Sequence, residues 1–243
     1  MITSKDNDLI KYCKQIKDKK YSKENNECLV ETYKIVSELL SKNLIKEILV
    51  TPNKSNLFDS SKIKINVISD NIARFLSDAI NNDGVFGVAY IPKYQNKISK
   101  KSIILDGLQD PSNIGAIIRS ARAFGFDRIF AVDTVYPYTF KCIRSSMSYI
   151  FDIDYKSITI SELIDIKKTQ NIKFICADMH GENLDNVNFP SENFAIIIGN
   201  EGHGVSKELK NLADYTLSIP MQNNVESLNA SVSASILMYT LKN

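Results

Sequence analysis

The sequence predicts an α/β protein in which a mostly parallel sheet carries helices on both faces and follows a small α/β domain. Short, continuously apolar runs such as residues 194–198 are typical of strands that are buried on both faces of a parallel sheet. Amphipathic helical patterns separate these runs, as they do in repeated strand and helix units. A polar, proline-containing segment without periodicity, residues 91–101, separates the two halves. We therefore predict a domain over residues 1–97 and a second over residues 98–243.

The first hundred residues alternate between the two kinds of pattern. Helical periodicity is found near residues 8–20, 29–42 and 70–80, and short apolar strands near residues 47–51, 63–68 and 85–91. This alternation predicts the small α/β domain.

In the second part of the chain, short strands and helices alternate at closer spacing. Strands are predicted at residues 103–105, 128–132, 173–177, 194–198 and 215–219. A helix is predicted over residues 113–124, because apolar side chains recur at helical spacing and Gly125 follows as a stop. The last helix, near residues 229–241, is predicted to be amphipathic.

Composition excludes several classes of protein. With 44% apolar and 24% charged residues, the 243-residue chain is ordinary for a globular protein, and no apolar run reaches the roughly 18 residues that span a bilayer. The N-terminus has no basic stub leading into an apolar stretch, so we expect a cytoplasmic protein without a membrane anchor. Four separated cysteines and two histidines indicate neither a disulfide framework nor a metal site.

Charge is distributed unevenly along the chain. Residues 1–100 hold 17 Lys and Arg against 12 Asp and Glu, whereas residues 101–243 hold 13 against 16. Six lysines lie between Lys11 and Lys23, which suits a segment that binds RNA phosphates. A solvated helix face explains the same lysines equally well.

The densest cluster of suggestive residues is Gly199-Asn200-Glu201-Gly202-His203-Gly204. It leaves a buried strand and precedes a helix that Ser206 caps, with Glu208 in its first turn. Such glycine density lets a backbone approach a ligand at the carboxyl end of a strand. A tight strand-to-helix turn is the simpler interpretation, but it does not explain Glu201. The pattern is neither a dinucleotide fingerprint nor a P-loop.

Two further segments carry polar residues at helix starts. Asn113 and Arg119 follow the turn signal Asp110-Pro111-Ser112. The position of Asn113 is typical of a helix cap. The side chain of Arg119 could either extend into solvent or bind a phosphate group. Ser227 and Asn229 flank Leu228 at the entry to the last helix, where one of them is expected to cap it. A hydrolase nucleophile is disfavoured, because no Gly-x-Ser-x-Gly elbow surrounds Ser227.

Taken together, these segments resemble the SpoU, or TrmH, branch of the SPOUT RNA methyltransferases. The resemblance covers residues 102–243 through three ordered motifs: Asn-x-Gly-x-x-x-Arg at 113–119, Gly-x-Glu-Gly-x-Gly at 199–204, and Ile-Pro-Met followed by Ser-Leu-Asn at 219–229. The N-terminal part is similar to the small substrate-binding domain of ribosomal-RNA members of the branch.

The resemblance implies a C-terminal trefoil knot, a rare exception to unknotted topology. It also implies that S-adenosylmethionine binds in the knot. Cofactor-binding residues carried over from the motifs are Gly199, Glu201, Gly202, Ile219, Met221 and Leu228. Catalytic residues are Arg119, Asn113, Glu201, Ser227 and Asn229, and the site is shared across a homodimer.

The implied reaction is transfer of a methyl group to a ribose 2′-hydroxyl in structured RNA. In the resemblance Arg119 activates that hydroxyl; because a neutral guanidinium is very costly, we expect a charged Arg119 that grips the adjacent phosphate. The N-terminal domain favours 23S ribosomal RNA, at a guanosine, over transfer RNA. A transfer-RNA ribose methyltransferase and a noncatalytic RNA-binding module on the same scaffold remain the alternatives.

Overall fold

The computed structural model describes residues 1–95, 99–187, 193–223 and 225–242. The chain divides into two compact units. The N-terminal unit comprises Met1–Pro92 together with Tyr138–Arg144, and the C-terminal unit comprises Lys93–Pro137 together with Ser145–Asn243. The boundary predicted between residues 97 and 98 lies outside the described residues.

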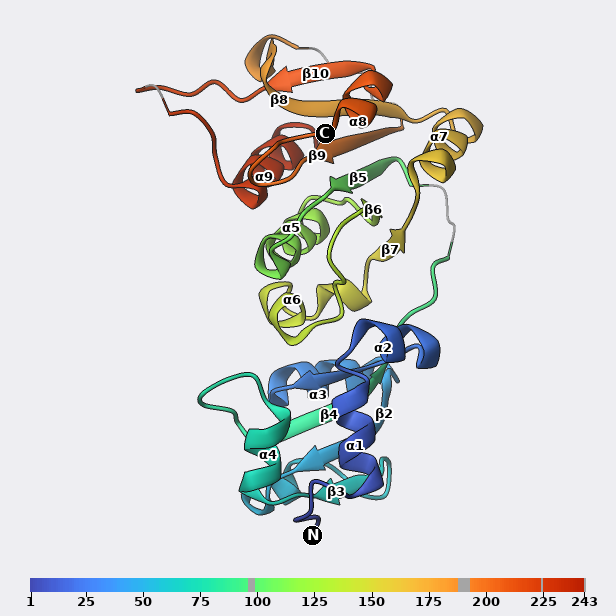
Figure 1. The fold of residues 1–243 in the computed structure, drawn as a ribbon, viewed down its shortest axis with the longest axis vertical. Coiled ribbons are helices and arrows are strands. Elements are labelled where there is room, and N and C mark those ends of the chain that lie inside the picture. The colour runs from blue at the N-terminus through green and yellow to red at the C-terminus, as the bar shows by residue number, and fades with distance from the viewer. Residues whose placement is uncertain (96–98, 188–192, 224, 243) are drawn as a thin grey trace. The chain divides into compact units, whose positions relative to one another are not determined.

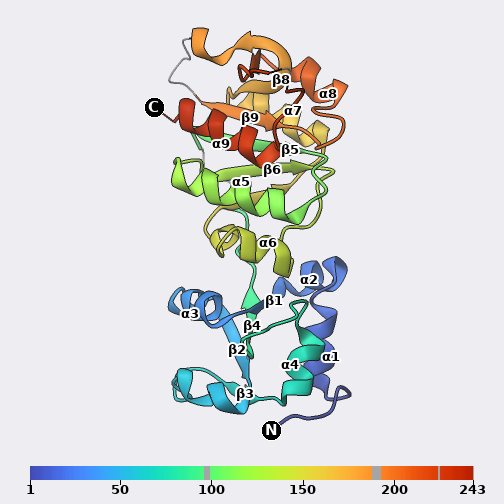
Figure 2. The same cartoon turned by 90° about the vertical axis from the view of Figure 1, so that its left-hand side faces the viewer.

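The N-terminal unit is built on a mixed sheet of order β1-β4-β2-β3. The strands are β1 (Glu27–Glu31), β2 (Ile45–Val50), β3 (Ile65–Val67) and β4 (Val85–Tyr90). β4 pairs antiparallel with β1 and β2, and β2 pairs parallel with β3. The helices are α1 (Asp8–Gln15), α2 (Lys19–Asn25), α3 (Tyr33–Ser41) and α4 (Asp70–Leu76), with a 3-10 helix η1 at Pro52–Leu57. Helix α3 covers one face of the sheet, and α1 and α4 cover the other (Figure 2).

Three predicted helices of this unit differ from the structure. The helix expected over residues 8–20 ends at Gln15, and α2 starts anew because Asp18 caps it by accepting a hydrogen bond from the Lys20 amide. The helix expected over 29–42 was wrong at its start, because residues 27–31 form β1, a strand buried along its whole length. The helix expected over 70–80 ends at Leu76.

The C-terminal unit contains a six-stranded sheet of order β10-β8-β9-β5-β6-β7 (Figure 1). The strands are β5 (Lys101–Asp106), β6 (Arg128–Val132), β7 (Asp154–Ser157), β8 (Lys173–Asn183), β9 (Phe194–Ile198) and β10 (Tyr215–Ser218). Every pair of neighbouring strands is parallel. The predicted parallel sheet is therefore confirmed, and its strands end at one common edge.

Helices cover both faces of this sheet. They are α5 (Pro111–Ala123), α7 (Ile160–Thr169), α8 (Lys207–Leu212) and α9 (Ala230–Thr240). Helix α6 (Phe140–Ser145) follows β6 along the chain, and 3-10 helices lie before β7 at Tyr149–Phe151 and after β8 at Leu184–Asn186. Figure 2 shows α5 and α9 together on one face, with α7 and α8 on the other. Leu163 of α7 and Leu209 of α8 pack into a core with Phe174 and Ile197 of the strands.

Local sequence explains where these helices begin and end. Pro111 stands in the first turn of α5, Asp110 caps it, and Gly125 follows it with a φ of 77°. Ser206 caps α8, with Glu208 in the first turn, as predicted. The last helix was expected to be amphipathic, but its outer side carries the apolar side chains Val232 and Tyr239, which are 45% and 58% exposed.

Strand β8 contains a register jump that shapes the site. Thr216 of β10 pairs with Cys176, whereas the next residue, Leu217, pairs with Glu182. Residues 177–181 therefore lie between two consecutive partners of β10, and we call them the β8 excursion. The strand predicted at 173–177 consequently extends to Asn183. Among the described residues, no helix is long and apolar enough to cross a membrane.

Candidate functional site

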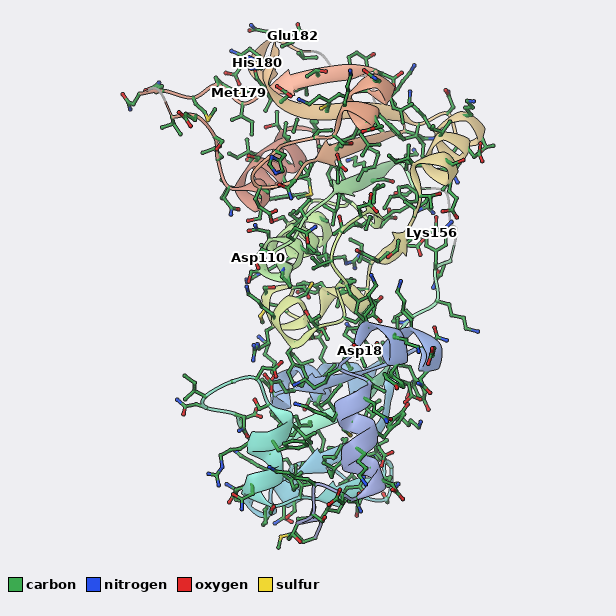
Figure 3. All side chains as sticks on the ribbon, viewed as in Figure 1. Asp18, Asp110, Lys156, Met179, His180 and Glu182 are labelled. Carbon is green, nitrogen blue, oxygen red and sulfur yellow. The ribbon has the colours of Figure 1, made fainter. Side chains whose placement is uncertain are left out.

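A pocket lies beside the C-terminal half of β8 and the ends of β9 and β10. Its volume of about 400 Å³ is within the usual range of small-molecule sites. Three chain segments far apart in sequence line it. They are the β8 excursion at 177–180, the glycine-rich loop at 198–204, and the stretch that contains Ile219, Met221 and residues 226–228; Lys210, Ala230 and Ser233 complete the lining. Figure 3 labels Met179 and His180 at the end of β8.

The glycine-rich loop is tightly folded. A Cβ at Gly199 would lie 2.2 Å from the backbone carbon of Gly204, so only glycine fits this close approach. Asn200 holds the turn, because its side-chain oxygen accepts hydrogen bonds from the amides of Gly202 at 2.8 Å and His203 at 3.1 Å. Its side-chain amide donates to the Gly107 carbonyl at 2.7 Å. The loop is thereby fixed to the turn that follows β5.

Glu201 is the centre of a hydrogen-bond network that joins all three motifs. Its carboxylate accepts from the Asn113 side-chain amide at 2.9 Å and from the backbone amides of Gln109 and Asp110, both at 3.3 Å. Asn113 in turn accepts from the Asn229 side chain at 3.0 Å. Burial raises the pKa of Glu201, but the hydrogen bonds that it accepts outweigh burial and lower the pKa below its ordinary value.

Two predicted helix caps have different outcomes. Asn113 does not cap α5, because Asp110 does so by accepting from the Ser112 amide at 2.9 Å. Asn113 is instead only 9% exposed and contacts Glu201. Asn229 caps α9 by accepting from the Ser231 amide at 2.9 Å, so the expectation that one residue of the third motif caps the helix is confirmed.

The structure brings most of the predicted site residues together. Gly199, Glu201, Gly202, Ile219, Met221, Ser227 and Leu228 line the pocket. Asn113 and Asn229 are held against Glu201 by hydrogen bonds and do not line it. Arg119 is separate: its side chain is exposed on α5, does not line this pocket, and forms no hydrogen bond or ion pair with the described residues.

Sequence reasoning missed several polar residues of the site. Asp106, at the end of β5, accepts from the Ser206 amide at 2.6 Å and so fixes the start of α8. Asp178 and Lys210 form an ion pair in the pocket lining. Both aspartates stand where an apolar strand meets the edge of the sheet, and that position is the signal that indicates them.

The cysteines carry no site chemistry. All four are free and buried. Burial raises the pKa of the Cys176 thiol to about 11 and those of Cys13 and Cys142 to about 12. In the part of the chain that the structure describes, no group of three or more His, Cys, Asp or Glu side chains could hold a metal ion.

Comparison with known proteins agrees with this architecture. Residues 100–239 match the model of the SpoU rRNA methylase family. The chain is 30% identical over 249 residues to the 23S rRNA (guanosine(2553)-2′-O)-methyltransferase RlmP of Bacillus subtilis, which covers 99% of this chain and 98% of the relative.

Solved structures are similar along nearly the whole chain. One described as an RNA 2′-O ribose methyltransferase superposes with a TM-score of 0.82 at 25% identity, covering 99% of this chain and 97% of the other. The SpoU methyltransferase AviRb of Streptomyces viridochromogenes, solved with AdoMet, has a TM-score of 0.86 at 22% identity and covers 97% of both chains. At that identity, the second likeness shows the fold.

The parallel sheet with a ligand pocket at its carboxyl edge defines a ligand-binding α/β protein. The motifs that meet at this pocket lie inside the matched region. The chain belongs to the SpoU rRNA methylase family. It is accordingly an S-adenosylmethionine-dependent RNA methyltransferase.

Proposed function

We propose that this protein transfers a methyl group from S-adenosylmethionine to a ribose 2′-hydroxyl of 23S ribosomal RNA, at a guanosine, in the cytoplasm. The observation that carries the proposal is the network of Asn113, Glu201 and Asn229, which joins one residue of each motif beside one pocket. The full-length similarity to a guanosine 2′-O-methyltransferase of 23S rRNA supports the choice of substrate.

The pocket residues fit the cofactor. The pocket volume of about 400 Å³ suits a ligand of nucleoside size, and the pocket wall combines apolar side chains with loop backbone. Ile219, Met221 and Leu228 would contact the adenosine part, and the backbone around Gly199 and Gly202 would receive its polar edges. When bound, the cofactor supplies an activated methyl group.

The protein itself must form the binding pocket, position the ribose and stabilise the charge that develops during the reaction. The network around Glu201 keeps the glycine-rich loop in place, so that the pocket is formed before the ligand arrives. Ser227 and Asn229 position the ribose and shape the cofactor loop. Arg119 remains cationic, grips the phosphate next to the target ribose and stabilises charge that develops on the 2′-oxygen. That phosphate or a water molecule receives the hydroxyl proton.

Arg119 serves a second copy of the chain in this proposal. The side chain is exposed, unpaired within the described residues and outside the lining of its own chain's pocket. Val232 and Tyr239 on α9 add exposed apolar surface to the same unit. These features support a homodimer in which each Arg119 completes the site of the partner.

The N-terminal part, residues 1–97, would bind the RNA and residues 98–243 would catalyse the reaction. The excess of lysine in the first hundred residues supports this division. We also propose the trefoil knot. After β10 at the sheet edge, the chain returns so that α9 packs against α5 and β9, and this return supports threading of the C-terminal segment.

Methyl incorporation tests the reaction. Purified protein and labelled S-adenosylmethionine are incubated with 23S ribosomal RNA or with transfer RNA, and 2′-O-methyl positions are mapped. We expect one guanosine in 23S RNA to be methylated. Modification of transfer RNA alone would favour the alternative substrate, and cofactor binding without methylation of either RNA would favour the noncatalytic module.

Arg119 variants test the mechanism in the same assay. Arg119→Ala should lower the rate by roughly 10²–10³-fold, as loss of a charge-stabilising donor does elsewhere. Arg119→Lys should recover little of it, because a lysine cannot form the two-pronged contact with a phosphate. Near-complete recovery by lysine would show that the fork geometry is irrelevant.

A mixing experiment tests the shared site. Arg119→Ala and Leu228→Arg, the second of which fills the pocket, should each be inactive alone. Mixed in equal amounts and allowed to exchange subunits, they should regain about a quarter of the wild-type rate, because half of random dimers are hybrids with one intact site. A mixture as inactive as its parts would exclude the shared arrangement.

A further inference from the structure

The lining of the pocket contains an ion pair to which the reaction assigns no role. Lys210 of α8 contacts one carboxylate oxygen of Asp178 in the β8 excursion, and the other oxygen accepts from the His180 amide at 3.0 Å. The side chain of Asp178 is 14% exposed and that of Lys210 is 44% exposed. The hydrogen bond from Lys210 lowers the pKa of Asp178, and the same contact raises the pKa of Lys210. Both groups are therefore charged at neutral pH.

This pair is distinct from the other charges of the pocket. Lys210 is the one lysine or arginine among the described residues that line it. Glu201 already accepts hydrogen bonds from three donors, and Glu226 is a further carboxylate on the third segment. A ligand group with negative charge therefore finds a single permanent cation on this wall, at Lys210.

The chemistry of the cofactor supplies such a group. S-adenosylmethionine has a nucleoside at one end. At its other end it has a zwitterionic amino acid, with an ammonium group and a carboxylate group close together. A Lys and Asp pair presents the complementary charges side by side. Charge-assisted hydrogen bonds of this kind are roughly twice as strong as neutral ones.

We propose that Lys210 binds the carboxylate and Asp178 the ammonium of the amino-acid end of S-adenosylmethionine. The pair thereby selects cofactors that retain this end over nucleosides that lack it. The inference rests on the use of S-adenosylmethionine by this pocket. In the competing interpretation, the ion pair only ties the β8 excursion to α8.

Titration calorimetry with two ligands separates these interpretations without an activity measurement. S-adenosylhomocysteine contains the amino-acid end, and 5′-methylthioadenosine shares the nucleoside part without it. In the wild type the first should bind more tightly. Lys210→Met should reduce that preference by about tenfold, as expected for one charge-assisted contact, while the affinity for 5′-methylthioadenosine changes less than about twofold.

Three further measurements make the outcome decisive. Lys207→Met, on the same helix but outside the lining, should bind both ligands like the wild type. Lys210→Arg keeps the charge and should retain most of the preference. Equal weakening of both ligands by Lys210→Met, or no weakening, would overturn the proposal. A wild type that binds S-adenosylhomocysteine no better than 5′-methylthioadenosine would overturn it too, whereas failure to bind either ligand would refute the cofactor assignment itself.

Discussion

The contact between Asn113 and Glu201 allows a sharp test by a nearly isosteric change. Asn113→Asp replaces the amide that donates to the Glu201 carboxylate at 2.9 Å with a second carboxylate. At that separation, two unit charges repel by about 6 kcal/mol in an effective dielectric of about 20. Taking up one proton costs less, about 4 kcal/mol at pH 7 for a group with an ordinary pKa near 4.3. The pair therefore binds a proton.

The expected loss of stability does not exceed the protonation cost of about 4 kcal/mol, since Glu201 is exposed to water and can turn away. We expect about 2–4 kcal/mol at pH 7, which lowers the unfolding midpoint on the order of 10 °C. Repulsion raises the pKa of the carboxyl pair in the folded state. The loss of stability is therefore fully present at a pH above this raised pKa, and it is absent at a pH below the pKa of the unfolded chain. The difference from the wild type should thus shrink toward pH 4.

Thermal unfolding between pH 4 and 8, followed by circular dichroism, measures this effect. Asn171→Asp is the matched control, because it makes the same charge change at an exposed turn residue whose φ of 49° aspartate also adopts. If Asn113→Asp and Asn171→Asp unfold at the same temperature throughout this range, the contact between the two motifs does not exist in solution.

Three other predictions concern the same unit. Gly199→Ala should weaken S-adenosylhomocysteine binding at least tenfold in calorimetry, because its Cβ meets backbone at 2.2 Å, whereas Gly202→Ala, with its nearest neighbour at 3.5 Å, should weaken it much less; equal losses of affinity would contradict the close approach. Asp214→Asn should cost about 1 kcal/mol at pH 7, because the carboxylate accepts from Lys167 and from the Phe174 amide, at 2.7 and 2.8 Å. Burial raises the pKa of Asp214, but these contacts lower it overall, so its contribution is fully present above the unfolded pKa near 4 and is lost as the pH falls through the lowered folded-state pKa; a cost that does not decrease as the pH is lowered below 4 in urea titrations would refute this. The buried thiols should react with a thiol reagent only after unfolding, and rapid labelling of the native protein would contradict their burial.

Local pattern predicted the central strands because their surroundings leave no ambiguity. Residues 128–132 and 194–198 are apolar runs between turn signals, and both strands have these bounds. Residues 29–31 of β1 were predicted to begin a helix, because a short buried apolar run fits either periodicity, and pairing with β4 decides between them. Strand β7 at 154–157 carried no apolar signal, since it lies at the sheet edge and is only partly buried.

The contacts within the candidate site could not be predicted from local sequence either. The motifs singled out candidate residues, but did not predict what their side chains contact. Asn113 looked like a cap because a polar residue follows a turn, yet its partner Glu201 lies in the loop after β9, a strand that the order of the sheet brings beside β5. Likewise, Asp178 reaches Lys210 because the register of β8 jumps. Neither contact follows from spacing along the chain.

The β8 excursion has a consequence for how such enzymes can diversify. Residues 177–180 line the pocket but lie between the partners of β10, so an insertion or deletion there leaves every strand pair intact. A lineage could therefore remodel this wall in single mutational steps while inheriting the scaffold unchanged. Length variation among descendants should concentrate at this short stretch of chain.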